Sequence, residues 1–160
     1  MSEGMAIILS APSGTGKTTT CKLLREKLPD LKIAVSHTTR GIRDGEKDGA
    51  DYNFISQKEF EEKIENKEFL EWARVHSFYY GTAFQAINSN LQGGHDALLE
   101  LDVQGVESLR KMKYQGIYIL ILPPSIKEME ARLKKRGTDS EDSILQRIET
   151  GKKEVKKYKM

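Results

Sequence analysis

The sequence has 160 residues, a formal net charge of +2 at pH 7 and 31% charged residues. This length suits one domain with a proper core and is too short for two. The nearly balanced charge argues against nucleic acid as a partner. The single cysteine excludes an intramolecular disulfide and is typical of a reducing compartment. Since no apolar stretch approaches the ~20 residues of a membrane span and no signal-peptide layout opens the chain, we expect a cytoplasmic protein without a membrane partner.

The N-terminal part predicts a strand, a loop and a helix in that order. Residues 5–9 are apolar and suit a buried strand, and residues 11–18 read Ala-Pro-Ser-Gly-Thr-Gly-Lys-Thr. Apolar residues at helical spacing follow, with Cys21 among them as a buried thiol, until Pro29 ends the helix. A short strand is expected at residues 33–35.

The loop at residues 11–18 is predicted to bind phosphate. The pattern G-x-x-x-x-G-K-[ST] is met except at its first position, where Ala11 stands for glycine. In such a loop, backbone N–H groups and the N-terminus of the next helix attract phosphate. Lys17 then reaches the β- and γ-phosphates of a nucleotide, and Thr18 places its hydroxyl on Mg²⁺. A merely flexible turn with two glycines is less favoured, because strand, loop and helix arrive in the expected order.

The stretch 36–92 is predicted to be an insertion folded beside the main sheet. Residues 36–55 hold three glycines and many polar side chains, so they predict loops and short strands. A capping box at residues 56–59 opens a helix. Residues 69–75 predict a strand pair with a turn, and residues 82–85 predict the cap of a further helix.

The last third returns to core-like segments. Residues 97–101 and 116–122 predict mostly apolar strands. A helix follows the first strand, and two helices with capping signals at residues 125–128 and 138–141 follow the second. One face of the last helix carries Ile144, Ile148, Gly151 and Val155. Apolar strands that alternate with helices are typical of an α/β fold, in which helices cover both sides of a parallel sheet.

A ligand site is expected at the carboxyl ends of these strands, where parallel sheets bind their ligands. Lys17, Arg40 and Asp102 each come just past a predicted strand, so the three are expected to converge there.

Eight stretches occur in the order and with the spacing of one known family. They are Ala-Pro-Ser-Gly-Thr-Gly-Lys-Thr (11–18), Val-Ser-His-Thr-Thr-Arg (35–40), Gly-Ala-Asp-Tyr-Asn-Phe (49–54), Glu-Phe-Leu-Glu-Trp-Ala (68–73), Tyr-Tyr-Gly-Thr (79–82), Leu-Asp-Val-Gln-Gly (101–105), Leu-Pro-Pro-Ser (122–125) and Arg-Gly-Thr-Asp-Ser (136–140). On these stretches the sequence resembles guanylate kinase, which transfers the γ-phosphate of ATP to GMP. The resemblance implies a P-loop parallel sheet in three parts. These are a core (1–35 and 93–125), a GMP-binding insertion (36–92) and a helical lid (about 126–150).

The resemblance also implies the site residues. ATP would bind to Ala11, Pro12, Ser13, Gly14, Thr15, Gly16, Lys17 and Thr18, with Mg²⁺ held through Thr18. GMP would bind to Ser36, Arg40, Arg43, Tyr52, Glu71, Tyr80, Thr82 and Asp102. Catalysis would rest on Lys17, Arg40, Arg136 and Arg147, with Arg132 as a helper. A carboxylate such as Glu71 suits the two adjacent donors of guanine, and forked arginines suit a phosphate.

Each of these residues also has a purely structural interpretation. The loop of Arg40 and Arg43 holds three acidic residues, so a solvated ion-pair cluster is the alternative there. The two tyrosines would otherwise be core aromatics with a wet hydroxyl, and Glu71 would lie on the solvent side of its strand. The arginines of the lid would belong to a basic helix surface.

Four departures from the family pattern stand out. Ala11 replaces glycine, Gly41-Ile42 stands where a proline commonly precedes the second arginine, and Glu100 stands where aspartate is usual. The family also continues past residue 160 with a strand, whose asparagine meets the adenine, and a final helix. The 160-residue chain is therefore expected to be less stable and to bind ATP less well than a longer one.

The favoured function is an ATP:GMP phosphotransferase that accepts GMP and dGMP and acts as a monomer or homodimer. One alternative is a guanylate kinase-like module that binds a partner without turnover, against which the intact Gly16-Lys17-Thr18 argues. The other is a related small-molecule kinase, against which Glu71 and Tyr80 argue.

Overall fold

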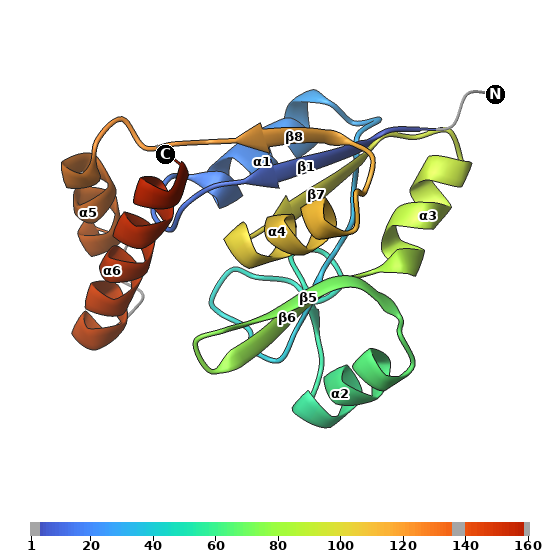
Figure 1. The fold of residues 1–160 in the computed structure, drawn as a ribbon, viewed down its shortest axis with the longest axis horizontal. Helices are drawn as coiled ribbons and strands as arrows, with labels where there is room; N and C mark the ends of the chain where they lie inside the picture. Colours follow the sequence, from blue (N-terminus) through green and yellow to red (C-terminus); the bar gives the residue numbers. More distant parts are fainter. Residues whose placement is uncertain (1–3, 136–139, 159–160) are drawn as a thin grey trace.

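Two four-stranded β-sheets organise the part of the chain that the computed structural model describes, residues 4–135 and 140–158 (Figure 1). The first sheet has the strand order β2 (Lys32–Ile33), β7 (Ala97–Leu101), β1 (Ala6–Ser10), β8 (Ile117–Leu120). All of its pairings are parallel. The expected α/β class with a parallel central sheet is therefore confirmed.

Helices cover both faces of this first sheet. On one face, α1 (Lys17–Lys27) packs Cys21 against Leu9 and Leu98. On the other face, α3 (Phe84–Gln92) and α4 (Val103–Lys111) contribute Ile87 and Leu109 to the main core. Cys21 is the buried thiol expected from the sequence, and burial raises its pKa to about 12, which keeps it protonated and unreactive.

The second sheet lies wholly within residues 37–83 and has the order β4 (Asn53–Phe54), β3 (His37–Thr38), β6 (Phe78–Ala83), β5 (Phe69–Val75). β3 pairs with β4 in parallel, and β6 pairs antiparallel with β3 and β5. On its outer face α2 (Gln57–Glu65), which begins with the predicted capping box, stacks the fully buried Phe60 on Phe69 at 4.4 Å. In Figure 1 this unit lies below the first sheet, with α4 between the two.

Two predictions inside this segment were wrong. Residues 69–75 form one strand rather than a strand pair, and the turn lies after Val75. The helix expected after residue 82 is present, but residues 82 and 83 end β6, and α3 begins at Phe84 with Ala83 as its N-cap residue and no side-chain cap. The reason is tertiary, because pairing of Glu71 with Thr82 and of Phe69 with Ala83 extends the ladder over the cap signal.

The last two described helices, α5 (Ile126–Lys135) and α6 (Glu141–Tyr158), form a pair beside the carboxyl end of the first sheet (Figure 1). Met129, Leu133, Ile148 and Val155 make their shared core. The predicted apolar face of α6 is thus confirmed. None of the helices within the described ranges is long and apolar enough to cross a membrane.

Candidate active site

The phosphate-binding loop links β1 to α1 through two glycines whose backbone conformation favours glycine. Gly14 has φ +81° and Gly16 has φ +98°, in the left-handed region that favours glycine. A Cβ on Gly14 would also lie 2.7 Å from Cγ of Leu133 in α5. Ala11 is buried and does not have a positive φ, so this first position of the loop does not require glycine.

Lys17 and Thr18 stand on the first turn of α1, directly behind this loop. Nζ of Lys17 donates to the backbone oxygen of Leu101 at 3.0 Å and lies 4.0 Å from Oε1 of Glu100. The ammonium group is therefore held at the carboxyl end of β7, where Asp102 also begins α4. Thr18 is exposed.

The donor atoms at this end of the sheet suit a magnesium ion. The hydroxyl of Thr18 is the side-chain donor predicted for the ion, and Mg²⁺ usually takes most of its remaining ligands from substrate phosphates and water. Within residues 4–135 and 140–158, no group of three or more His, Cys, Asp or Glu side chains forms a metal site by itself. An oxygen donor such as the hydroxyl of Thr18 fits a magnesium ion that would also be held by nucleotide phosphates.

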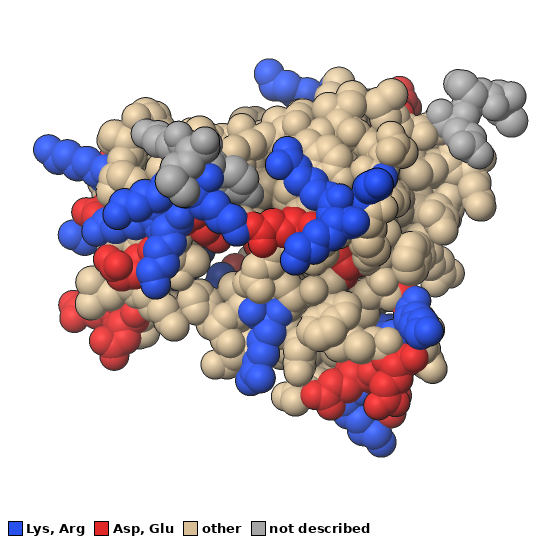
Figure 2. Space-filling model, viewed as in Figure 1, with Lys and Arg blue, Asp and Glu red and all other residues tan. Residues whose placement is uncertain are grey.

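Two arginines from the α5–α6 pair contact the phosphate-binding loop. Nη1 of Arg132 donates to the backbone oxygen of Thr15 at 3.4 Å, and Nε of Arg147 donates to Oγ of Ser13 at 3.4 Å. Figure 2 shows that basic side chains gather over α5 and α6, as expected if the lid arginines belong to a basic helix surface. These two arginines nevertheless face the loop. Arg136, the other predicted lid arginine, lies outside the described residues.

Glu71 is buried at the inner side of the second sheet, so its interpretation as a solvent-facing glutamate was wrong. It is 6% exposed, and its Oε1 accepts a hydrogen bond from the hydroxyl of Thr82 at 2.7 Å. The hydroxyl of Thr82 lies 2.9 Å from that of Ser36. Burial raises the pKa of Glu71 to about 7, with a further increase from the charge of Asp102 and opposing effects from Thr82 and Lys17.

A glycine that the sequence analysis did not single out makes room for this carboxylate. A Cβ on Gly105 would lie 2.7 Å from Oε2 of Glu71 and 3.3 Å from Oδ1 of Asp102. Asp102 is the N-cap of α4, and its Oδ1 accepts from the N–H of Gly105 at 2.8 Å. Asp102 therefore has a structural role as well as its predicted place beside Glu71. The stretch Leu-Asp-Val-Gln-Gly was the sequence signal for Gly105.

Arg40 forms a buried ion pair and not the solvated cluster offered as the alternative. Its guanidinium is 8% exposed and donates to both oxygens of Glu46, at 2.8 and 3.1 Å. Burial opposes ionisation of Glu46, but the hydrogen bonds from Arg40 and from the backbone of Arg43, together with the charges of both arginines, hold the pKa of Glu46 below its usual range. The guanidinium also lies 5.6 Å from the ring centre of Tyr52, which in turn is 5.9 Å from that of Tyr80.

The other predicted phosphate ligand, Arg43, is exposed at the rim of this cluster. Its backbone N–H donates to Oε2 of Glu46 at 2.9 Å, so one carboxylate organises both arginines. The sequence analysis did not predict this role of Glu46 as the partner of Arg40, since it placed Glu46 only among the acidic neighbours of that arginine.

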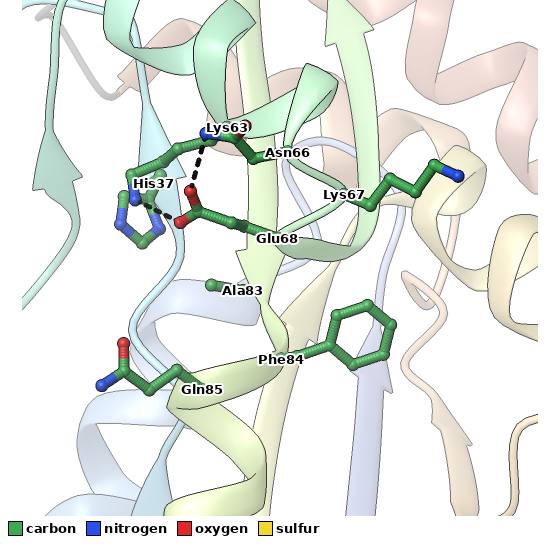
Figure 3. A pocket seen from close by; sticks show the side chains of 8 residues that line it. All are labelled: His37, Lys63, Asn66, Lys67, Glu68, Ala83, Phe84 and Gln85. Carbon is green, nitrogen blue, oxygen red and sulfur yellow. Dashed lines mark hydrogen bonds and ion pairs between the residues drawn. The ribbon is translucent and has the colours of Figure 1, made fainter.

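A cavity of about 300 Å³ lies elsewhere, on the outer side of the second sheet (Figure 3). It is lined by His37, Lys63, Asn66, Lys67, Glu68, Ala83, Phe84 and Gln85. Lys63 and Glu68 are joined by a 2.8 Å ion pair in it, while Lys67 and Phe84 point to one side and Gln85 to the other. None of the predicted site residues lines it, so cavity size does not locate the site here. A much smaller cavity of about 20 Å³ touches Ser36, Tyr52 and Glu100.

Comparisons with known proteins identify the family of the chain. The family model described as guanylate kinase matches residues 3–160. The guanylate kinase of Caldanaerobacter subterraneus subsp. tengcongensis is 46% identical over 153 residues, which are 96% of this chain and 74% of that protein. The guanylate kinase of Carboxydothermus hydrogenoformans is 44% identical over 155 residues, covering 97% and 76%. The chain belongs to the guanylate kinase family.

The solved structures place the fold in the same family. The crystal structure of guanylate kinase from Anaplasma phagocytophilum superposes with a TM-score of 0.69 at 34% identity, over 86% of this chain and 70% of that chain. Guanylate kinases are ATP:GMP phosphotransferases, so the kinase function expected from the resemblance is confirmed at the level of the family. Nothing in these comparisons favours the binding module or the kinase with another acceptor.

Proposed function

We propose that this chain transfers the γ-phosphate of ATP to GMP or dGMP at the carboxyl end of β7. The loop at residues 11–18 would hold the phosphates of ATP, and the inner side of the second sheet would hold the acceptor nucleotide. One observation carries the proposal: the buried carboxylate of Glu71 and the cation of Lys17 flank the same strand end.

Glu71 is the proposed reader of the guanine base. One of its oxygens already accepts from Thr82, and an ionised carboxylate retains acceptor sites for two further donors. Guanine presents two adjacent donors, N1–H and the 2-amino group, on one edge. Ser36, Thr82 and Asp102 would complete the surroundings of the base. None of these proposed contacts involves the ribose 2′-hydroxyl, which supports dGMP as a second acceptor.

The phosphate of GMP would bind where Arg40 and the hydroxyls of Tyr52 and Tyr80 gather, with Arg43 at the rim. A guanidinium held by Glu46 is oriented before substrate arrives, and a forked donor suits phosphate oxygens. Burial raises the pKa of Tyr52 above its usual range, so its hydroxyl stays a donor at neutral pH.

The transfer itself needs positioning and charge neutralisation rather than a strong base, because the transferred group passes through a loose transition state. Lys17 and Arg147 are the described side chains proposed for this task, and Arg136 is proposed from the resemblance alone. Mg²⁺ held through Thr18 would add positive charge at the β- and γ-phosphates.

The division into a core (1–35 and 93–125), a GMP-binding insertion (36–92) and a lid (about 126–150) is part of this proposal. It is supported by the second sheet, whose strands and α2 all lie between residues 37 and 83. We also propose a cytoplasmic setting, action as a monomer or homodimer, and no nucleic-acid or membrane partner. The balanced charge and the single cysteine support these points.

A coupled assay of ADP release with ATP and Mg²⁺ tests the proposal, using GMP, dGMP, AMP, CMP and UMP as acceptors. We expect release that depends on GMP or dGMP. Release of ADP with none of the five acceptors would favour a binding module, and release with a pyrimidine nucleotide alone would favour a kinase with another acceptor.

A further inference from the structure

One face of α6 lies against a single residue of the phosphate-binding loop, Ser13. Arg147 donates to its side-chain oxygen at 3.4 Å, and Glu154 accepts from its backbone N–H at 3.1 Å through Oε2. Between them, a Cβ on Gly151 would lie only 3.1 Å from the backbone oxygen of Ser13. The spacing of four and three residues places all three on one side of the helix. The side chain, the carbonyl and the amide of Ser13 therefore each meet α6.

Gly151 permits this close approach. The same Cβ would lie 2.8 Å from Sδ of Met129, so the position is enclosed by α5 on one side and by the loop on the other. A missing side chain at this point of α6 brings the flanking Arg147 and Glu154 within hydrogen-bonding distance of the loop.

Glu154 is the unexpected member of this contact. It is half-buried, and burial raises its pKa, while the hydrogen bond from Ser13 and the charge of Lys17 oppose that rise and the charge of Asp102 adds to it. Burying a carboxylate is costly unless a donor compensates, and here a backbone N–H of the phosphate-binding loop is that donor. The contact joins residues 141 positions apart.

We propose that Glu154 is a positioning residue for phosphoryl transfer. Its carboxylate fixes the peptide between Pro12 and Ser13 and thereby holds α6, with Arg147, against the loop that binds the transferred phosphate. The inference rests on the role proposed above for Arg147. Phosphoryl transfer depends on placed charge, and small displacements of a positioning group lower the rate. Glu154 itself touches neither nucleotide in this scheme.

Replacing Glu154 tests this placement. Glu154→Ala removes the acceptor, and we expect kcat to fall on the order of tenfold, the effect of losing one hydrogen bond to a charged group. The KM for GMP should change less than about twofold, because the residues proposed to bind GMP lie at positions 36–82 and 102, outside α5 and α6. Glu154→Gln keeps an acceptor oxygen at the same place and should retain kcat within about threefold. Glu149→Ala, a glutamate that is 66% exposed on the same helix, is the matched control and should behave as wild type.

A double-mutant cycle separates positioning from general support of the fold. If Glu154 acts through Arg147, the double variant Glu154→Ala/Arg147→Ala should be no slower than Arg147→Ala alone. Losses that multiply would overturn the proposal, as would a kcat for Glu154→Ala within twofold of wild type. The proposal would also be overturned if Glu154→Ala and Glu154→Gln lowered kcat equally and lowered the melting temperature equally.

Two further measurements keep the result unambiguous. If Glu154→Ala does not fold, Glu154→Asp shortens the side chain by one methylene, and we expect the same fall in kcat. A wild-type rate for that variant would contradict the proposal. Absence of GMP-dependent ADP release from the wild-type chain would instead contradict the proposed function, which distinguishes the two failures.

Discussion

Burial of Glu71 has two opposing effects on its proposed role in binding guanine. Its burial excludes water from the place where guanine would bind, which strengthens any hydrogen bond made there. The same burial raises its pKa to about 7, which favours the protonated carboxyl as the pH falls below neutral. Only the ionised form accepts two donors, and GMP would therefore bind to part of the population.

This gives a prediction for pH. The KM for GMP should rise as the pH falls through about 7, approaching tenfold per pH unit well below it. The contribution of Glu71 to the free energy of unfolding should change in the opposite direction, so that it favours the folded state at low pH. Because the folded pKa of Glu71 is raised, its contribution to stability is fully present below the usual glutamate range and is lost as the pH rises through about 7. Steady-state kinetics and thermal melts between about pH 5.5 and 8 measure both. A KM that is flat in wild type, or that has the same pH dependence in wild type and Glu71→Gln, would contradict the assignment.

Replacing Lys17 and replacing Arg147 are predicted to have different effects on activity. Lys17→Ala should abolish transfer at an unchanged melting temperature, since Lys17 neutralises phosphate charge and its Nζ contacts only the edge of the core. Arg147→Ala should lower kcat more than it raises the KM for GMP, because an arginine of a closing element acts mainly in the transition state. The exposed Lys22 on the same helix as Lys17 provides a control, Lys22→Ala, that should keep full activity. A normal kcat with weakened GMP binding in Arg147→Ala would show that it does not act from a lid.

At the scale of elements, local signals predicted most helix starts and failed where strands pair. Ser56 and Ser125 cap α2 and α5 as the sequence indicated. The signal at residues 82–85 was overridden by the long antiparallel pairing of β5 with β6, a contact that no local pattern contains. The same pairing sets Glu71 opposite Thr82. The wrong prediction at residues 82 and 83 therefore concerned the strand that carries the hydrogen-bond partner of Glu71.

The start of α4 offers a prediction at this scale. Gly105→Ala would raise helix propensity but place a Cβ 2.7 Å from Oε2 of Glu71. The carboxylate must then move, and we expect the kcat/KM for GMP to fall about tenfold with little change in melting temperature. Gln104→Ala, at the exposed neighbouring position, is the control. Unchanged GMP kinetics in Gly105→Ala would mean that Glu71 has room to shift without loss.

At the scale of the whole molecule, the sequence named the candidate site residues but not the atoms that they contact. The loop pattern identified Lys17, and the resemblance identified Glu71, Arg40 and Arg147. Neither indicated that Lys17 would donate to the end of β7, or that Glu154 would meet Ser13. Such contacts join distant segments through backbone atoms, which carry no side-chain signature in the sequence.

The exposed edge strand β8 gives a prediction about association of the whole molecule. β8 is an edge of the first sheet, and Ile117 and Ile119 are 48% and 44% exposed. An apolar edge strand favours association of copies. We expect the 160-residue chain to elute at larger apparent mass as its concentration rises, and Ile117→Thr/Ile119→Thr to reduce this. A concentration-independent monomer would contradict the prediction.

The selectivity of phosphoryl transfer tests the central claim most directly. Adenine presents a lone pair where guanine presents N1–H, so AMP would face the buried carboxylate of Glu71 without a donor at that position. Sites that pair with a buried polar group reject such analogues by about 10⁴. We therefore predict that the ratio of kcat/KM for GMP over AMP is on the order of 10⁴ in wild type and falls sharply in Glu71→Gln. Comparable turnover of GMP and AMP by the wild-type chain would contradict the account.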